Sequence, residues 1–146
     1  MQSVSMLLAF LVGAGLVVQV ALNMTISKAV GSAPLAALAN FVVGTAVIAL
    51  LLLAFRVELP AREQWAAVPW WAWLGGTLGA AYVATATFTG PRLGALLLLA
   101  LTVGGQMIAS MIVDHYGLLG FAREPLDASR VLGAVLLCVG IFLIAR

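Results

Sequence analysis

Long uncharged apolar runs alternate along this chain with short segments that hold nearly all of its charged residues. An α-helix rises 1.5 Å per residue, so about 20 apolar residues cross the hydrocarbon core of a bilayer. The runs that approach this length predict transmembrane helices over about residues 4–26, 34–55, 70–89, 93–113 and 130–146. The pattern therefore predicts an all-α integral membrane protein with five transmembrane helices.

The segments between the runs indicate how the helices are connected. Residues 56–69 are the most water-like stretch, and the tryptophans of residues 70–73 suit the headgroup level of a bilayer. Residues 90–92, Gly-Pro-Arg, predict a tight turn that makes the third and fourth helices an antiparallel hairpin. No basic residue precedes the first run, so we expect it to be a retained helix rather than a cleaved signal peptide.

Composition excludes several classes of protein. Only 8% of the residues are charged, against roughly 25% in soluble domains, and the mean hydropathy is +1.19. The basic residues are scattered singly, which argues against nucleic-acid binding, and the lone Cys138 allows neither a disulfide framework nor a metal-ligand spacing. No catalytic motif is visible. We expect a single transmembrane domain over residues 1–146 in the cytoplasmic membrane, with no enzyme activity, cofactor or metal.

The charges in the loops give little preference for either orientation. Five helices place alternate loops on opposite sides of the membrane, and positively charged loops favour the cytoplasmic side. The two sets are Lys28, Arg92 and Arg146 on one side, and Arg56, Arg62, Arg123 and Arg130 on the other. Such a balance favours insertion in both orientations and pairing of two inverted copies, the symmetry that transporters commonly obtain from inverted repeats. The alternative is that a single charge such as Lys28 fixes one orientation.

Polar residues recur at helical spacing inside the apolar runs. In the fourth helix, Thr102, Gln106, Ser110 and Asp114 follow each other at intervals of four and share one face. The candidate substrate-binding residues are Gln19, Asn23, Asn40, Tyr82, Gln106, Ser110 and Asp114. Carboxamides are costly to bury without partners, and a central aqueous pocket would satisfy them together. The alternative is that they hydrogen-bond across helices, while small residues allow close helix packing. The glycines expected to do so are Gly15, Gly44, Gly75 and Gly79.

Two interpretations stay open for Asp114 and His115, which end the fourth helix. Asp114 is a candidate to bind a cation or a coupling proton, and His115 titrates near neutral pH in its ordinary state. Alternatively, both hold the following loop by hydrogen bonds to its backbone. As neighbours on a helix, they point about 100° apart.

Several segments resemble the five-helix YdcZ-like family of the drug/metabolite transporter superfamily, and the similarity covers about residues 15–140. The segments that carry it are Gln19 with Leu22-Asn23, residues 34–45, residues 73–79, Gly105-Gln106 and residues 114–120. The resemblance implies a small exporter or importer that works as a dimer of oppositely oriented subunits, a ten-helix assembly with alternating access to a shared pocket. The small multidrug resistance branch has a glutamate in its first helix. This chain has Gln19 and Asn23 there, which favours a neutral or zwitterionic polar substrate.

The function expected from the sequence is that of a secondary transporter protomer, acting as an antiparallel homodimer in the lipid bilayer on a small polar metabolite or drug-like compound. One alternative is a dual-topology ion channel, which predicts flux faster than conformational cycling allows. Another is a scaffold or accessory subunit that transports nothing. A third keeps the transporter but replaces the second copy with a homologous partner of opposite charge bias.

Overall fold

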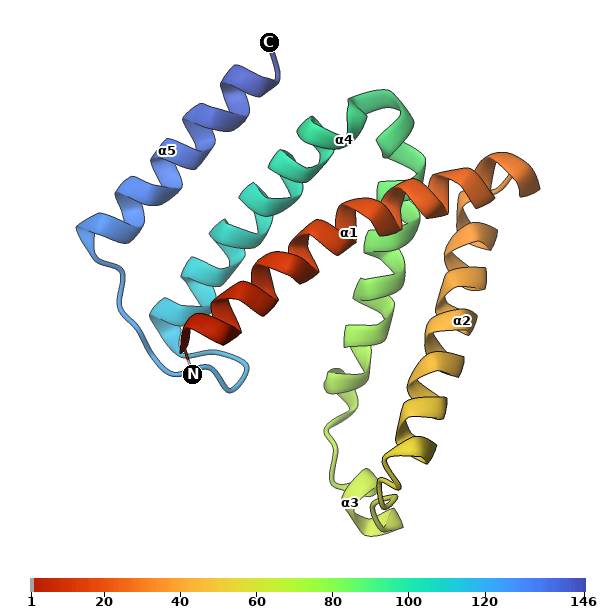
Figure 1. Ribbon diagram of the computed structural model, residues 1–146. Coiled ribbons are helices and arrows are strands. Elements are labelled where there is room, and N and C mark those ends of the chain that lie inside the picture. Colours follow the sequence, from red (N-terminus) through yellow and green to blue (C-terminus); the bar gives the residue numbers. More distant parts are fainter. Residues whose placement is uncertain (1) are drawn as a thin grey trace. The chain divides into compact units, whose positions relative to one another are not determined.

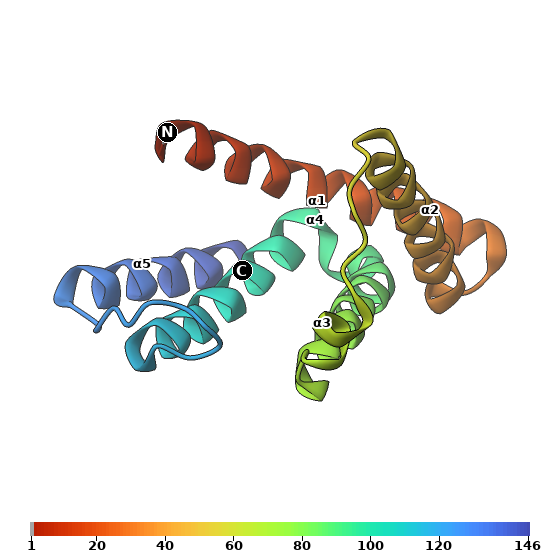
Figure 2. The same ribbon diagram turned by 90° about the horizontal axis from the view of Figure 1, so that it is seen from below.

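The computed structural model describes residues 2–146, and every regular element in this range is a helix (Figure 1). Figure 2 shows the same helices from below. The chain forms two compact units, the first ending at Pro91 and the second running from Arg92 to Arg146. The elements are α1 (Gln2–Val30), α2 (Ala33–Ala54), α3 (Arg62–Ala66), the 3-10 turn η1 (Trp70–Trp73), α4 (Leu74–Tyr116) and α5 (Ala128–Ile144).

These lengths fit the five predicted membrane segments. Within the described residues, α1, α2 and the stretch Trp70–Tyr116 are each long and apolar enough to cross a membrane. The last stretch has 47 residues, and at 1.5 Å per residue it extends for roughly 70 Å, enough for two crossings. The shorter apolar helix α5 has 17 residues. The prediction of a single domain over residues 1–146 stays a prediction.

The interruption of α4 lies at Gly94, so the predicted turn at residues 90–92 was wrong. Residues 90–92 are helical, and Pro91 lies inside the helix. Gly94 has φ 76° and ψ 161°, a conformation that is nearly restricted to glycine. Proline lacks an N–H but is tolerated in membrane helices, so the chain breaks where glycine permits a positive φ. Gly94 thus separates a first arm of α4 from a second arm, and the antiparallel pairing of these arms stays a prediction.

Small side chains let α1 and α2 approach each other in the first unit. Ala36 and Ala37 on α2 are buried, and so is Asn23 on α1. The Ser32 hydroxyl caps α2 by accepting a hydrogen bond from the Leu35 N–H at 3.4 Å. α1 continues to Val30, past the predicted end at residue 26, so Lys28 belongs to its last turn.

Tryptophans gather where the chain leads from α2 into α4. The rings of Trp65 and Trp73 stack with centroids 6.0 Å apart, and Trp70, Trp71 and Trp73 are exposed. Exposed tryptophans beside apolar helices are typical of the membrane–water interface. The position of this cluster at the headgroup level stays a prediction.

In the second unit, the Ile141 side chain of α5 reaches α4 at Gly104, a residue that the sequence did not single out. A Cβ atom at Gly104 would lie 2.6 Å from Ile141 Cδ1. Additional methyl groups at Gly15, Gly44 and Gly75 would meet nothing within 4 Å, and one at Gly79 would lie 4.0 Å from Phe41 Cζ. The packing role of these four glycines stays a prediction.

We predict that Gly104→Ala lowers the stability of the second unit modestly, because only the flexible end of Ile141 has to move. Adding Ile141→Val removes the clashing Cδ1 atom, so the double variant is expected to lose less than the sum of the two single losses. Thermal unfolding of the purified protein measures this coupling. Gly105→Ala is the matched control, since a Cβ there meets nothing within 4 Å. Strictly additive losses at Gly104 and Ile141 would contradict the close contact.

Candidate functional site

Two of the predicted polar residues, Asn23 and Asn40, meet between α1 and α2. The Asn40 Nδ2 group donates a hydrogen bond to Asn23 Oδ1. Asn23 is only 1% exposed, and its own Nδ2 group has no hydrogen-bond partner within the part of the chain that the structure describes. A buried donor without an acceptor is destabilising by about 1–3 kcal/mol. Asn23 therefore offers an unused hydrogen-bond donor inside the first unit.

The other predicted residues of the first unit lie apart from this pair. Gln19 is on α1, one turn before Asn23, and is exposed. Tyr82 is half-buried on the first arm of α4, next to the buried Val83. The structure thus joins two of the four predicted residues in this unit and leaves Gln19 on the surface of the protomer.

A pocket of about 300 Å³ lies in the second unit between the second arm of α4 and α5. It is lined by Met107, Ser110, Met111, Asp114, Arg130, Gly133 and Ala134. Two predicted residues, Ser110 and Asp114, therefore lie together, as their spacing of four indicated. Gln106 is exposed and does not line the pocket, although it belongs to the same stripe. The Thr102 hydroxyl donates to the Leu98 carbonyl at 2.8 Å.

Arg130 is the centre of the charged groups at this pocket. Its guanidinium forms an ion pair with the Glu124 carboxylate and donates to the Glu124 carbonyl at 3.4 Å. A longer contact of 3.8 Å reaches Asp114 Oδ2. The Asp114 and Arg130 side chains are 36% and 37% exposed, so solvent or lipid headgroups reach both. Arg130 is held mainly by Glu124, and Asp114 is only loosely paired.

The end of α4 is closed by a Schellman motif at Gly117, which has φ 63°. The Leu118 N–H donates to the Val113 carbonyl at 2.9 Å, and the Gly117 N–H donates to the Asp114 carbonyl at 3.3 Å. The Glu124 N–H also donates to the Asp114 carbonyl, at 2.8 Å. These bonds fold the loop back on the helix end and bring Glu124 within reach of Arg130.

His115 has a structural role in this loop. Its Nδ1 atom accepts a hydrogen bond from the Leu126 N–H at 3.3 Å, and its carbonyl accepts one from Arg123 Nε at 3.3 Å. The geometry favours the loop-holding interpretation for His115, whereas the Asp114 side chain faces the pocket.

Sequence reasoning missed the residues that fix Arg130, although one local signal was available. Asp127 is the N-cap of α5 and accepts hydrogen bonds from the Arg130 N–H at 2.8 Å and the Ser129 hydroxyl at 2.7 Å. These two bonds hold the pKa of the Asp127 carboxyl below its ordinary value. An aspartate directly before an apolar run is a typical helix start. Asp127 therefore indicates where the first turn of α5 begins, and this turn contains the Arg130 backbone.

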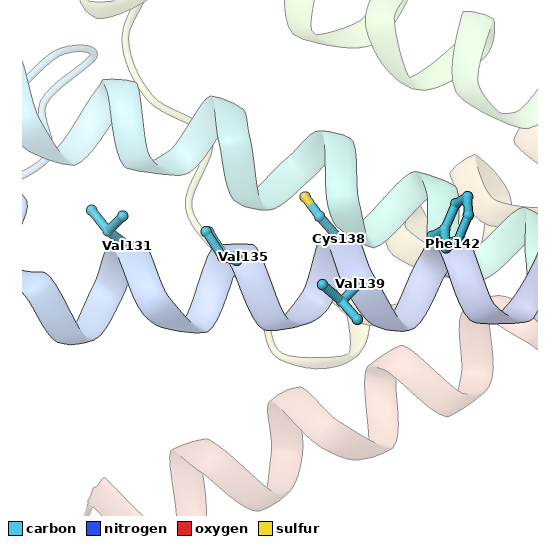
Figure 3. A pocket seen from close by; sticks show the side chains of 6 residues that line it. Val131, Val135, Cys138, Val139 and Phe142 are labelled. Carbon is cyan, nitrogen blue, oxygen red and sulfur yellow. The ribbon is translucent and has the colours of Figure 1, made fainter.

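A second hollow, of about 400 Å³, lies along α5 (Figure 3). It is lined by Val131, Ala134, Val135, Cys138, Val139 and Phe142. The exposed Cys138 contributes only a thiol to this apolar surface. No group of three His, Cys, Asp or Glu side chains in residues 2–146 is arranged to hold a metal ion. A hollow of this composition suits hydrocarbon rather than a polar compound.

Apolar helices of spanning length define the chain as a membrane-embedded, multi-pass protein. A family described as "Putative inner membrane exporter, YdcZ" matches residues 4–143. The inner membrane protein YdcZ of Escherichia coli (strain K12) is 31% identical over 144 residues, which cover 97% of this chain and 96% of that protein. No solved structure matches the chain. The chain belongs to the YdcZ family, as the resemblance in its sequence implied.

Proposed function

We propose that this chain is a secondary-transporter protomer that pairs with an inverted copy of itself and moves a small polar compound across the inner membrane by alternating access. The description of the matching family as exporters supports a transport role. The observation that carries the proposal is the unused donor of Asn23, which is buried among apolar helices. Membrane proteins retain such costly groups mainly for function.

Two exposed amide side chains support an aqueous pocket that forms between two copies of the chain rather than within one. Gln19 and Gln106 lie at the depth of the apolar runs and are exposed on their respective units. A carboxamide that faces hydrocarbon is destabilising. A second copy, or an aqueous chamber between two copies, would supply the missing partners.

The balance of loop charges supports pairing of inverted copies. If Gly94 separates two crossings, Arg92 lies in the connection between them, opposite the side that holds Arg56 and Arg62. Neither side then holds a clear excess of basic residues, which is the condition for insertion in both orientations. Two inverted copies have two access states of equal energy, because each state is the other viewed from the opposite side.

Cysteine labelling tests the orientation. In a Cys138→Ala background, Ala29→Cys places a thiol in the last turn of α1 and Glu58→Cys places one in the loop after α2. Both positions are exposed, and the proposed topology puts them on opposite sides of the membrane. We expect a membrane-impermeant maleimide to label about half of the copies of each variant on intact spheroplasts, since both orientations are populated. Full labelling of one variant and none of the other would show a single orientation and overturn the antiparallel pair.

Reconstitution tests the mechanism separately. Vesicles that contain the protein are expected to show saturable uptake and exchange of a labelled substrate. Unsaturable passage of inorganic ions would show a channel instead. The absence of both activities, with the inverted pair intact, would identify a scaffold.

A further inference from the structure

We infer that the pocket of the second unit binds a primary ammonium group, and that the transported compound carries one. This inference rests on the proposed function, because it names the chemical class of the substrate. The pocket lies between the second arm of α4 and α5 and measures about 300 Å³. Its chemistry is given by Ser110 and Asp114 on α4 and by Arg130 on α5.

Ser110 and Asp114 present hydrogen-bond acceptors to a ligand in this pocket. The Ser110 hydroxyl donates to the Met107 carbonyl at 2.9 Å, so its oxygen presents lone pairs. The ionised Asp114 carboxylate offers only acceptors. Two of the five Arg130 N–H groups bond to Glu124, through the ion pair and the contact with the Glu124 carbonyl. A group that donates hydrogen bonds therefore suits Ser110 and Asp114, and a primary ammonium has three N–H donors.

The net charge of the side chains around the pocket favours a cationic ligand over a neutral hydrogen-bond donor. Asp114 and Glu124 are two carboxylates around one guanidinium, Arg130, which leaves one uncompensated negative charge. The neighbouring Arg123 and Asp127 carry opposite charges, so they leave this balance unchanged. Asp114 is 36% exposed and only loosely paired with Arg130, so its carboxylate is open to a cation. One bound ammonium group neutralises it without displacing Glu124 from Arg130.

The remaining walls suit the hydrocarbon part of such a compound. Met107, Met111 and Ala134 line the pocket, and methionine adapts its shape to varied apolar groups. The volume lies at the small end of the range for ligand pockets. The geometry points to a small amine whose apolar body lies along the methionines and whose nitrogen lies between Ser110 and Asp114.

Thermal shift of the full-length protein in detergent tests this inference with three probes. The n-butylammonium ion carries the charge and the N–H donors, 1-butanol has a similar shape without the charge, and tetramethylammonium has the charge without N–H groups. We expect n-butylammonium to stabilise the protein by mass action, 1-butanol to have no effect, and tetramethylammonium to bind more weakly.

Variants locate the binding site. Asp114→Asn keeps the shape of the side chain and is expected to weaken n-butylammonium binding at least about tenfold, since a hydrogen bond to a charged group is lost. Ser110→Ala retains every charge and is expected to weaken binding a few-fold. Glu58→Gln is the matched control, because it removes the same charge from an exposed position in the other unit. Unliganded unfolding curves verify that each variant folds.

Three results would overturn the inference. They are equal stabilisation by 1-butanol, unchanged n-butylammonium binding in Asp114→Asn, and stabilisation by butyrate that Arg130→Gln abolishes. The last would show that Arg130 releases Glu124 to bind an anion. If any of these occurs while labelling still shows inverted copies and vesicles still exchange substrate, the transport proposal stands and only the ammonium site is wrong.

Discussion

Replacing Gly94 with valine is expected to lower the free energy of unfolding by about 1–3 kcal/mol, the range for a residue forced into a sparsely populated backbone conformation. Gly94 has φ 76° and ψ 161°, where a Cβ atom collides with the backbone. Valine is the sharper test, because its branched Cβ restricts the backbone further. Thermal or denaturant unfolding of the purified protein in detergent measures the loss.

The matched control for this substitution is Gly105→Val on the second arm of α4. Gly105 is helical, and a Cβ there meets nothing within 4 Å, so we expect unfolding close to that of the unmodified protein. Gly94→Ala should fall between the two. If Gly94→Val and Gly105→Val unfold alike, the interruption of the helix does not depend on glycine at position 94.

The membrane helices could be predicted from the sequence because hydropathy alone determines which segments enter a bilayer. The residues at which these helices begin and end were less predictable. Residues 27–30 extend α1 past the expected boundary, since a lysine near a helix end remains compatible with the helix. The break in α4 was misplaced because Gly90 and Gly94 both flank Pro91. Choosing between them needs the backbone dihedral angles, which the sequence pattern does not contain.

The candidate site was predictable to the extent that it depends on spacing within one helix. Ser110 and Asp114 share a pocket because residues four apart lie on one face. The contact between Asn23 and Asn40 depends on how α1 packs against α2. The pairing of Glu124 with Arg130 depends on how the loop after Gly117 folds back. These contacts between elements follow from the tertiary fold, so the polar stripes alone did not predict them.

The contact between Ile141 and Gly104 also follows from the tertiary fold. The expected packing glycines were chosen for their positions on polar stripes or in Gly-rich steps, whereas a close helix contact depends on which faces of two helices meet. A Cβ at Gly104 would meet Ile141 of α5, and no feature of the sequence marks that pair of faces. Helix pairing, rather than helix formation, limits what the sequence predicts in this chain.

Asn40→Leu is expected to reduce both stability and transport, because it leaves the buried Asn23 amide with no partner for either end. Leucine branches at Cγ as asparagine does, so the change removes polarity with little change of shape. The stability loss should be about 1–2 kcal/mol, between the cost of an orphaned buried amide and the smaller values found for polar pairs in bilayers. Unfolding in detergent and substrate exchange in vesicles measure the two effects.

The double variant Asn23→Leu with Asn40→Leu separates the two roles of the pair. Removing both polar groups leaves no buried donor or acceptor unpaired, so stability should recover most of the single-variant loss. A pair that only fastens α1 to α2 would then recover its function as well. Because we assign the buried Asn23 donor a role in transport, we expect exchange to stay reduced in a protein of restored stability. Full exchange by the double variant would contradict that assignment and leave the amides as a helix contact.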